Sequence, residues 1–155
     1  MAKRGWNGIT KLTTKRGRYA VRKFKAFSIL AELPAGYYCS VRELCLASGL
    51  TYYSLARALP NWVLWDYVTR YPMTECGQGD YMYRLLPHGR SWFRLAMVQL
   101  PNANLFRREL EIWRNQVMDK AMYESLLTLP FNDFVTQLHE LVKASDISQK
   151  QGKGY

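Results

Sequence analysis

The sequence predicts a mainly helical α+β fold that contains one small antiparallel β-hairpin. Two observations in the first half carry this prediction: a pair of short amphipathic helices joined at a glycine, over residues 41–62, and two strand-like runs flanking a glycine-containing turn, over 63–86. A third observation is the series of amphipathic helices expected after residue 90, which exceeds what the central part needs to close a core.

The helix pair is predicted from apolar spacing and from residues that end and begin helices. The first helix places three apolar residues on one face: Val41, Leu44 and Cys45. Gly49 is expected to end it in the left-handed conformation, and Thr51 to cap the next helix. The second helix turns its own apolar set inward: Leu55, Ala58, Leu59 and Trp62. This pattern is typical of a helix-turn-helix, although an ordinary corner between two helices shares it.

The flanking segments complete a compact unit. A helix with a broad apolar stripe is expected up to Leu33, followed by a short extended segment, 37–39, available as a third strand. Ser40 and Glu43 have the spacing of a capping box. After the helix pair, residues 63–73 alternate like a strand, 74–80 form a turn with two glycines, and 81–86 return.

Residues 20–95 resemble the winged helix-turn-helix domain of small bacterial, archaeal and viral transcription regulators. Three segments carry the resemblance: SVRELCLASGLTYYSLARAL, WDYVTR and YMYRLLPHGRSWF. The last is similar to the family's usual ending, in which a strand leads through a polar residue, a glycine and a basic residue into the next helix. The resemblance covers about half the chain. It implies a DNA-binding domain at 19–89, although a fold does not by itself dictate what is bound.

Positive charge is concentrated at the N-terminus. The net charge is +10, and residues 1–25 hold nine of the 22 basic residues and no acid, whereas the other 13 nearly balance 12 acids. Residues 1–18 are therefore interpreted as a basic flexible arm that holds a nucleic-acid backbone, with a merely solubilising tail as the alternative.

Double-stranded DNA is the predicted partner, with the recognition helix at 51–61 in the major groove and the wing at 74–80 beside it. The side chains expected to contact DNA belong to the recognition helix, the helix before it, the wing and the arm: Thr51, Tyr52, Tyr53, Ser54, Arg57, Arg42, Arg70, Gln78, Arg84, Lys15, Arg16 and Arg18. Arg57 is the strongest single candidate, for a guanine or a phosphate. Because the recognition helix carries only this one base, a winged-helix adaptor that docks another protein through Tyr52 and Tyr53 is the alternative.

Three helices are expected after the wing, at about 90–100, 103–127 and 130–142. We expect residues 90–143 to form a helical extension that pairs two copies into a homodimer through 90–142, with completion of the core as the alternative. Residues 144–155 are polar and predict a disordered tail.

The sequence predicts no enzyme, no metal site and no cofactor. His88 and His139 lie apart from other ligand-type residues, and His88 is a loop or phosphate-contacting candidate. Three cysteines without paired spacing suggest neither a disulfide framework nor a zinc site, and Cys45 is expected in the core. No apolar run approaches the roughly 20 residues that cross a bilayer, and no secretory signal is evident, so a cytoplasmic location without membrane contact is expected.

Overall fold

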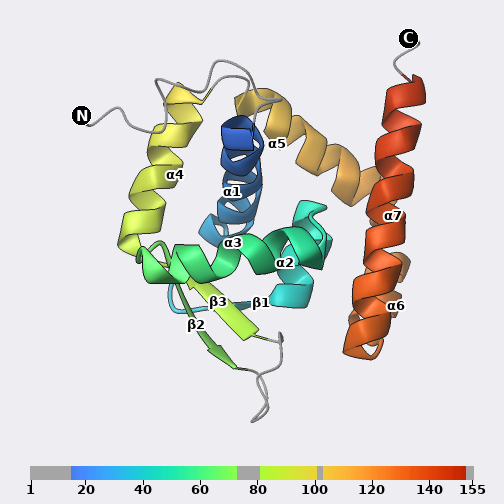
Figure 1. Ribbon diagram of the computed structural model, residues 1–155, viewed down its shortest axis with the longest axis horizontal. Helices are drawn as coiled ribbons and strands as arrows, with labels where there is room; N and C mark the ends of the chain where they lie inside the picture. The colour runs from blue at the N-terminus through green and yellow to red at the C-terminus, as the bar shows by residue number, and fades with distance from the viewer. Residues whose placement is uncertain (1–14, 73–80, 101–102, 153–155) are drawn as a thin grey trace.

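The computed structural model describes the backbone of residues 15–72, 81–100 and 103–152, and the side chains of 19–72, 81–100 and 103–145. Figure 1 shows the elements, which follow one another along the chain in this order: α1 (Lys15–Ala31), β1 (Cys39–Ser40), α2 (Val41–Ser48), α3 (Tyr52–Leu64), β2 (Val68–Pro72), β3 (Tyr81–Leu85), α4 (Pro87–Gln99), α5 (Ala103–Ile112), the π-helical turn η1 (Trp113–Val117), α6 (Lys120–Leu127) and α7 (Phe131–Gly152). The predicted class, mainly helical with a small antiparallel sheet, is confirmed.

The sheet has three antiparallel strands in the order β1-β3-β2. The segment expected as a third strand does pair with β3, although it forms its ladder at Cys39 and Ser40. The order of elements in this part of the chain is therefore helix, short strand, two helices and a two-stranded hairpin.

The first helix of the pair begins and ends, and the second begins, at the capping residues predicted from the sequence. The Ser40 hydroxyl accepts a hydrogen bond from the Glu43 N–H at 3.1 Å, and the Glu43 carboxylate accepts from the Ser40 N–H, which completes the capping box. Gly49 ends α2 with φ of 74°. The Thr51 hydroxyl accepts from the Ser54 N–H at 3.2 Å and caps α3. Each predicted inward-facing residue of the two helices is buried.

The second helix is longer than predicted, and the strand expected at 63–73 is correspondingly shorter. Helix α3 continues through Pro60 to Leu64, and β2 begins only at Val68. The reason is Trp62, which is fully buried and donates its indole N–H to the Tyr19 hydroxyl at 2.7 Å. The free energy gained by burying this large side chain in the core exceeds the strand preference of the β-branched and aromatic residues that follow it.

Two predictions for the C-terminal half are wrong. The helix expected at 103–127 is broken by η1 and by a new N-cap at Asp119, whose carboxylate accepts from the Met122 N–H at 2.8 Å. The break follows from Trp113, which is buried against α2 and donates its indole N–H to the Leu46 carbonyl at 2.6 Å. Helix α7 runs on to Gly152 although a disordered tail was expected from 144, because no proline or glycine interrupts residues 131–151.

The N-terminal boundary also moves. Helix α1 begins at Lys15, so the last residues of the expected flexible arm, 15–18, are helical. Residues 1–14 of the predicted arm lie outside the described residues, as does the wing tip at 73–80.

Helix α1 runs through the middle of the molecule, with α4 on its left and α5 on its right in Figure 1, and it also contacts both helices of the pair. Phe24 packs against Phe93 and Phe106, with ring centroids 5.4 and 6.1 Å apart, and so joins α1 to α4 and α5. On the other side of the molecule, Phe134 and Leu138 of α7 are fully buried in the same core as the helix pair. None of the helices in the described part of the chain has the length and apolar character needed to cross a membrane.

Candidate nucleic-acid interface

Helix α3 presents one exposed stripe along its whole length. The stripe consists of side chains at helical spacing: Tyr53, Arg57, Pro60, Asn61 and Leu64. Arg57 is the single charged residue of this helix, and no acid lies on it. The helix predicted to recognise DNA therefore offers one cation together with tyrosine, amide and apolar groups.

Helix α7 covers the N-terminal end of α3. The ring of Tyr52 meets Phe131 edge-on with centroids 5.0 Å apart, and Tyr53 meets His139 edge-on at 5.4 Å. Figure 1 shows α7 running past this end of the helix pair, and the two helices are in contact. Tyr52 is consequently half-buried, whereas Tyr53 keeps about half of its surface exposed, at 51%.

Arg42 was expected to touch a nucleic-acid backbone, but the structure gives it an internal role. Its guanidinium donates to the carbonyl oxygens of Leu127, the last residue of α6, at 3.2 Å, and of Leu129, in the turn that follows. It also lies over the rings of Phe131 and Phe134, at 5.5 and 5.3 Å. Arg42 therefore ties α2 to the α6–α7 corner and satisfies carbonyls that have no partner within their own helix.

Thr51 and Ser54 also interact with each other. Beyond the capping bond, their hydroxyl oxygens lie 3.1 Å apart in a second hydrogen bond. Both residues are half-buried. They hold the start of α3 in place, so we assign them a positioning role next to the exposed stripe.

The wing strands place the two predicted arginines on opposite faces of the sheet. Arg70 pairs in register with Tyr83, and Arg84 with Thr69, and neighbouring positions of a strand point to opposite faces. Arg70 is exposed and lies 4.3 Å from the centroid of the Tyr81 ring. Burial raises the pKa of Tyr83, and a hydrogen bond with Arg70 acts in the opposite direction. Arg84 is half-buried, and its guanidinium lies 5.0 Å from the centroid of the Tyr38 ring. Of the two arginines, only Arg70 lies on the sheet face that carries the buried Tyr83.

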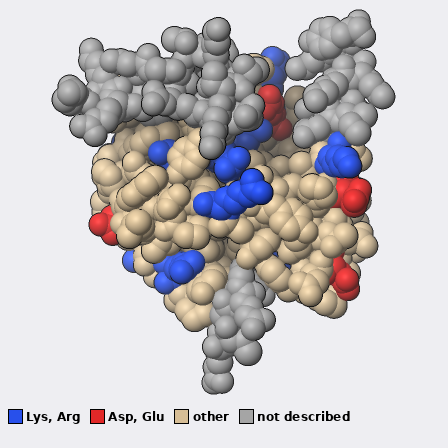
Figure 2. Space-filling model, viewed as in Figure 1, with Lys and Arg blue, Asp and Glu red and all other residues tan. Residues whose placement is uncertain are grey.

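The remaining predicted contacts are not placed. Gln78 lies outside the described residues, and Lys15, Arg16 and Arg18 occupy the first turn of α1 with side chains outside the described part. Figure 2 shows the face on which α3 runs: lysine and arginine side chains lie near its centre and toward its margins, and acidic side chains lie at the left and right edges and above the centre.

Sequence reasoning missed a buried cation beneath the C-terminal end of α3. Lys23 of α1 is only 7% exposed, and its ammonium lies 4.2 Å from the ring centroid of Trp92, 4.7 Å from Tyr67 and 5.4 Å from Tyr19. Burial lowers the pKa of Lys23 from 10.5 to about 8. Among the described residues it forms no ion pair. The only signal in the sequence was the spacing of Tyr19 and Lys23, four positions apart on one helix.

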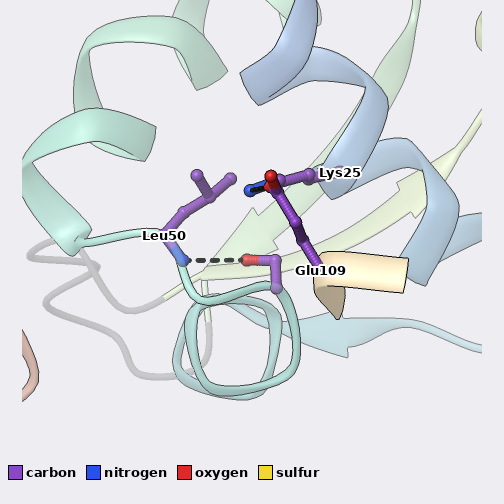
Figure 3. Close-up of polar contacts among 4 residues, drawn as sticks. Lys25, Leu50 and Glu109 are labelled. Atoms are coloured by element: carbon purple, nitrogen blue, oxygen red, sulfur yellow. Dashed lines mark hydrogen bonds and ion pairs between the residues drawn. The ribbon is translucent and has the colours of Figure 1, made fainter. Parts of the chain in front are cut away.

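Two further contacts stiffen the surroundings of the helix pair. His88, in the first turn of α4, stacks flat on Tyr67 with centroids 4.8 Å apart. Lys25 of α1 forms an ion pair with Glu109 of α5 at 3.0 Å, close to the Leu50 N–H, which donates to the Ser48 hydroxyl in the turn of the helix pair (Figure 3). The turn is thereby packed against α1 and α5.

Groups suited to bond-making chemistry do not converge in the described part of the chain. No cluster of three or more histidine, cysteine or acidic residues there is arranged to hold a metal ion. Cys39 and Cys45 are unpaired and buried, the latter as predicted. Burial raises the pKa of the Cys39 thiol to about 12 and also raises that of Cys45, so both thiols are protonated near neutral pH.

Comparison with models of known protein families, with curated proteins and with solved structures finds no significant match to this chain.

Proposed function

We propose that this protein binds duplex DNA in the cytoplasm as a sequence-specific transcriptional regulator of the winged helix-turn-helix kind. The observation that carries the proposal is the exposed stripe of α3, which bears Arg57 and no acid and belongs to the second helix of a helix pair followed by a hairpin. In such domains the second helix enters the major groove and the hairpin contacts the adjacent backbone.

The position of α7 favours the middle of α3 as the reading surface. Helix α7 lies against Tyr52 and Tyr53, so the first turn of α3 is partly covered. Arg57 and Asn61 lie one and two turns further along the same stripe and are exposed. We assign base contact to these two residues, and backbone contact to Arg70 of the wing and to the basic residues of the N-terminal arm.

The test is binding of the full chain to duplex DNA at two salt concentrations, by fluorescence anisotropy. Arg57→Ala and Arg70→Ala are each expected to weaken binding, and loss of one phosphate contact reduces the slope of log affinity against log salt by about 1. A third variant combines Lys3→Gln, Arg4→Gln and Lys11→Gln, which isolates the arm. Arg108→Ala, exposed on α5, is the matched control and should bind like the unaltered protein. If every variant, the control included, lost DNA affinity to the same extent, the binding would reflect the net charge of the protein and not the contacts assigned here.

A second candidate function is an adaptor that docks another protein through α3. It is favoured by Leu64 and Trp65 at the end of the stripe, which are 74% and 49% exposed. Apolar side chains of this size are more typical of protein interfaces than of DNA contacts. The two candidates differ in salt dependence: DNA affinity falls steeply with ionic strength, whereas docking through apolar groups changes little.

We also propose that two copies pair through the exposed side of α4. Leu95 and Val98 lie one turn apart there and are 49% and 84% exposed. A two-fold contact on this helix would supply a second half-site for DNA. Sedimentation analysis of the full chain tests it: Val98→Glu should convert a dimer into monomers, and a chain that sediments as a monomer before any substitution would contradict the proposal.

A further inference from the structure

A cavity of about 300 Å³ opens between the end of α1, the turn that follows it, the end of β3 and the start of α4. Its walls expose polar and apolar surface in about equal measure, and the apolar side chains open to it include Leu33 and Tyr37. A volume of this size corresponds to about ten water molecules, at the lower end of the range seen for small-molecule sites. The space therefore suits a small ligand rather than a macromolecule.

Two arginines line the same cavity. Arg84 comes from β3 and Arg90 from the first turns of α4, and both are half-buried. The Arg84 guanidinium lies over the Tyr38 ring at 5.0 Å, and Arg90 donates weakly to the Ala31 carbonyl at 3.5 Å. Neither arginine forms an ion pair with a described carboxylate. Two guanidinium groups are thus drawn partly out of water at one cavity without a compensating negative charge.

The surrounding groups leave that positive charge in place. Glu32, next to the cavity wall, is turned to Arg114, with which it pairs at 3.3 Å. Helix α4 begins at the cavity with Pro87, and its N-cap residue, Leu86, offers no side-chain acceptor to the first N–H groups. The start of a helix carries partial positive charge, which adds to that of the arginines.

We infer that this cavity is a binding site for a small monocarboxylate with an apolar body, whose carboxylate lies between Arg84 and Arg90 and whose hydrocarbon part contacts Leu33 and Tyr37. Guanidinium groups bind carboxylates through paired, charge-assisted hydrogen bonds. The accessible apolar surface of Leu33 and Tyr37 favours an organic acid over inorganic phosphate, because phosphate has no apolar surface to bury there. The assignment does not depend on DNA binding.

The experiment is a titration of the full chain with benzoate, followed by two-dimensional ¹⁵N NMR. We expect saturable binding with a dissociation constant of about 1 mM or tighter, and shifts confined to residues 30–37 and 84–90. Benzamide, the neutral analogue of the same shape, should bind at least about tenfold more weakly because it lacks the charge that pairs with the arginines.

Five variants, one of them a control, assign the contacts. Arg84→Gln and Arg90→Gln should each weaken benzoate binding about tenfold or more, and Arg90→Lys should recover part of the loss. Arg94→Gln, on α4 outside the cavity, is the matched control and should leave affinity unchanged. Leu33→Trp should abolish binding by filling the space, which keeps the test decisive if Arg90→Gln unfolds through loss of its contact with Ala31. Equal affinity for benzamide, equal affinity for phosphate, or unchanged affinity in the glutamine variants would overturn the inference.

Discussion

The ring of Tyr53 on α3 lies edge-on against His139 on α7, with centroids 5.4 Å apart. A tyrosine predicted to contact DNA is therefore in contact with the C-terminal helix of the same chain. Helix α7 also carries two exposed acids, Asp133 and Glu140, which lie seven positions apart on its solvent-facing side and add negative charge to the helix that covers the start of α3.

The first prediction follows from those acids. Asp133→Asn and Glu140→Gln are each expected to raise the affinity for duplex DNA about two- to fivefold at low salt, because each removes a negative charge from the helix that contacts the start of α3 and weakly screened charges act over several ångströms. Binding curves at low and high salt measure the effect, which should fade as salt rises. The control is Glu111→Gln on α5, which makes the same change in net charge. If it raises affinity as much, α7 does not border the DNA.

The second prediction separates structural from binding roles among the arginines. Arg42→Met should lower the free energy of unfolding by about 1.5–3 kcal/mol, because the carbonyls of Leu127 and Leu129 lose a charged donor. DNA affinity of the folded protein should stay unchanged. Urea unfolding and anisotropy measure the two effects.

Arg57→Met provides the matched comparison, since Arg57 is exposed on α3. Its expected outcome is reversed: stability within about 0.5 kcal/mol of the unaltered protein, and weaker DNA binding. A loss of affinity in Arg42→Met without a loss of stability would restore Arg42 to the DNA-contact set.

The elements that could be predicted from the sequence are those determined by neighbouring residues. Ser40, Gly49 and Thr51 act as caps within a few positions of the groups they satisfy, so their roles follow from spacing alone. The buried faces of α2 and α3 likewise follow from the helical repeat.

What could not be predicted depends on contacts between distant residues. The break after α5 depends on Trp113 reaching the Leu46 carbonyl, and the extension of α3 depends on Trp62 reaching Tyr19. Arg42 was expected to point to solvent, because a helical repeat shows which side faces the partner helix and not which later helix covers the other side. The helical repeat likewise could not show which part of the candidate site a later helix covers. Arg57 is exposed, whereas the first turn of α3 is partly covered by α7.

The third prediction concerns the end of α3. Asp66 has φ of 61°, the left-handed region, and the turn is closed by hydrogen bonds from the Asp66 N–H to the Val63 carbonyl at 3.1 Å and from the Tyr67 N–H to the Trp62 carbonyl at 2.9 Å. This is a Schellman motif, whose left-handed position favours glycine. Asp66→Gly should therefore raise the free energy of unfolding by about 0.5–1 kcal/mol, measured by urea unfolding.

Asp66→Ala is the control for that substitution. Alanine removes the same exposed carboxylate but keeps the Cβ atom, so it should not stabilise the protein and should lower its stability. Equal stabilisation by glycine and alanine would show that the effect comes from the charge and not from the backbone.

The fourth prediction concerns the ammonium of Lys23 among three aromatic rings. Burial lowers its pKa from 10.5 to about 8, so between these pH values the folded protein releases a proton that the unfolded chain still holds. The unfolded state then binds more protons, and stability rises with pH in this window. Lys23→Met should remove that rise and should stabilise the protein at pH 7, by about 1–3 kcal/mol. We expect a stabilisation near the lower end of this range, because the rings of Tyr19, Tyr67 and Trp92 stabilise the charged form of Lys23.

Urea unfolding of both proteins from pH 7 to 9.5 checks this, with the difference in unfolding free energy plotted against pH. The range stops there because burial raises the pKa values of Tyr19 and Tyr67, and these tyrosines oppose the trend above about 10, where unfolded tyrosines ionise. Lys120→Met, on the exposed surface of α6, is the control and should show no pH-dependent difference. A flat difference for Lys23→Met as well would mean that the rings hold the ammonium charged throughout, with cation–π attraction fully offsetting the cost of burial.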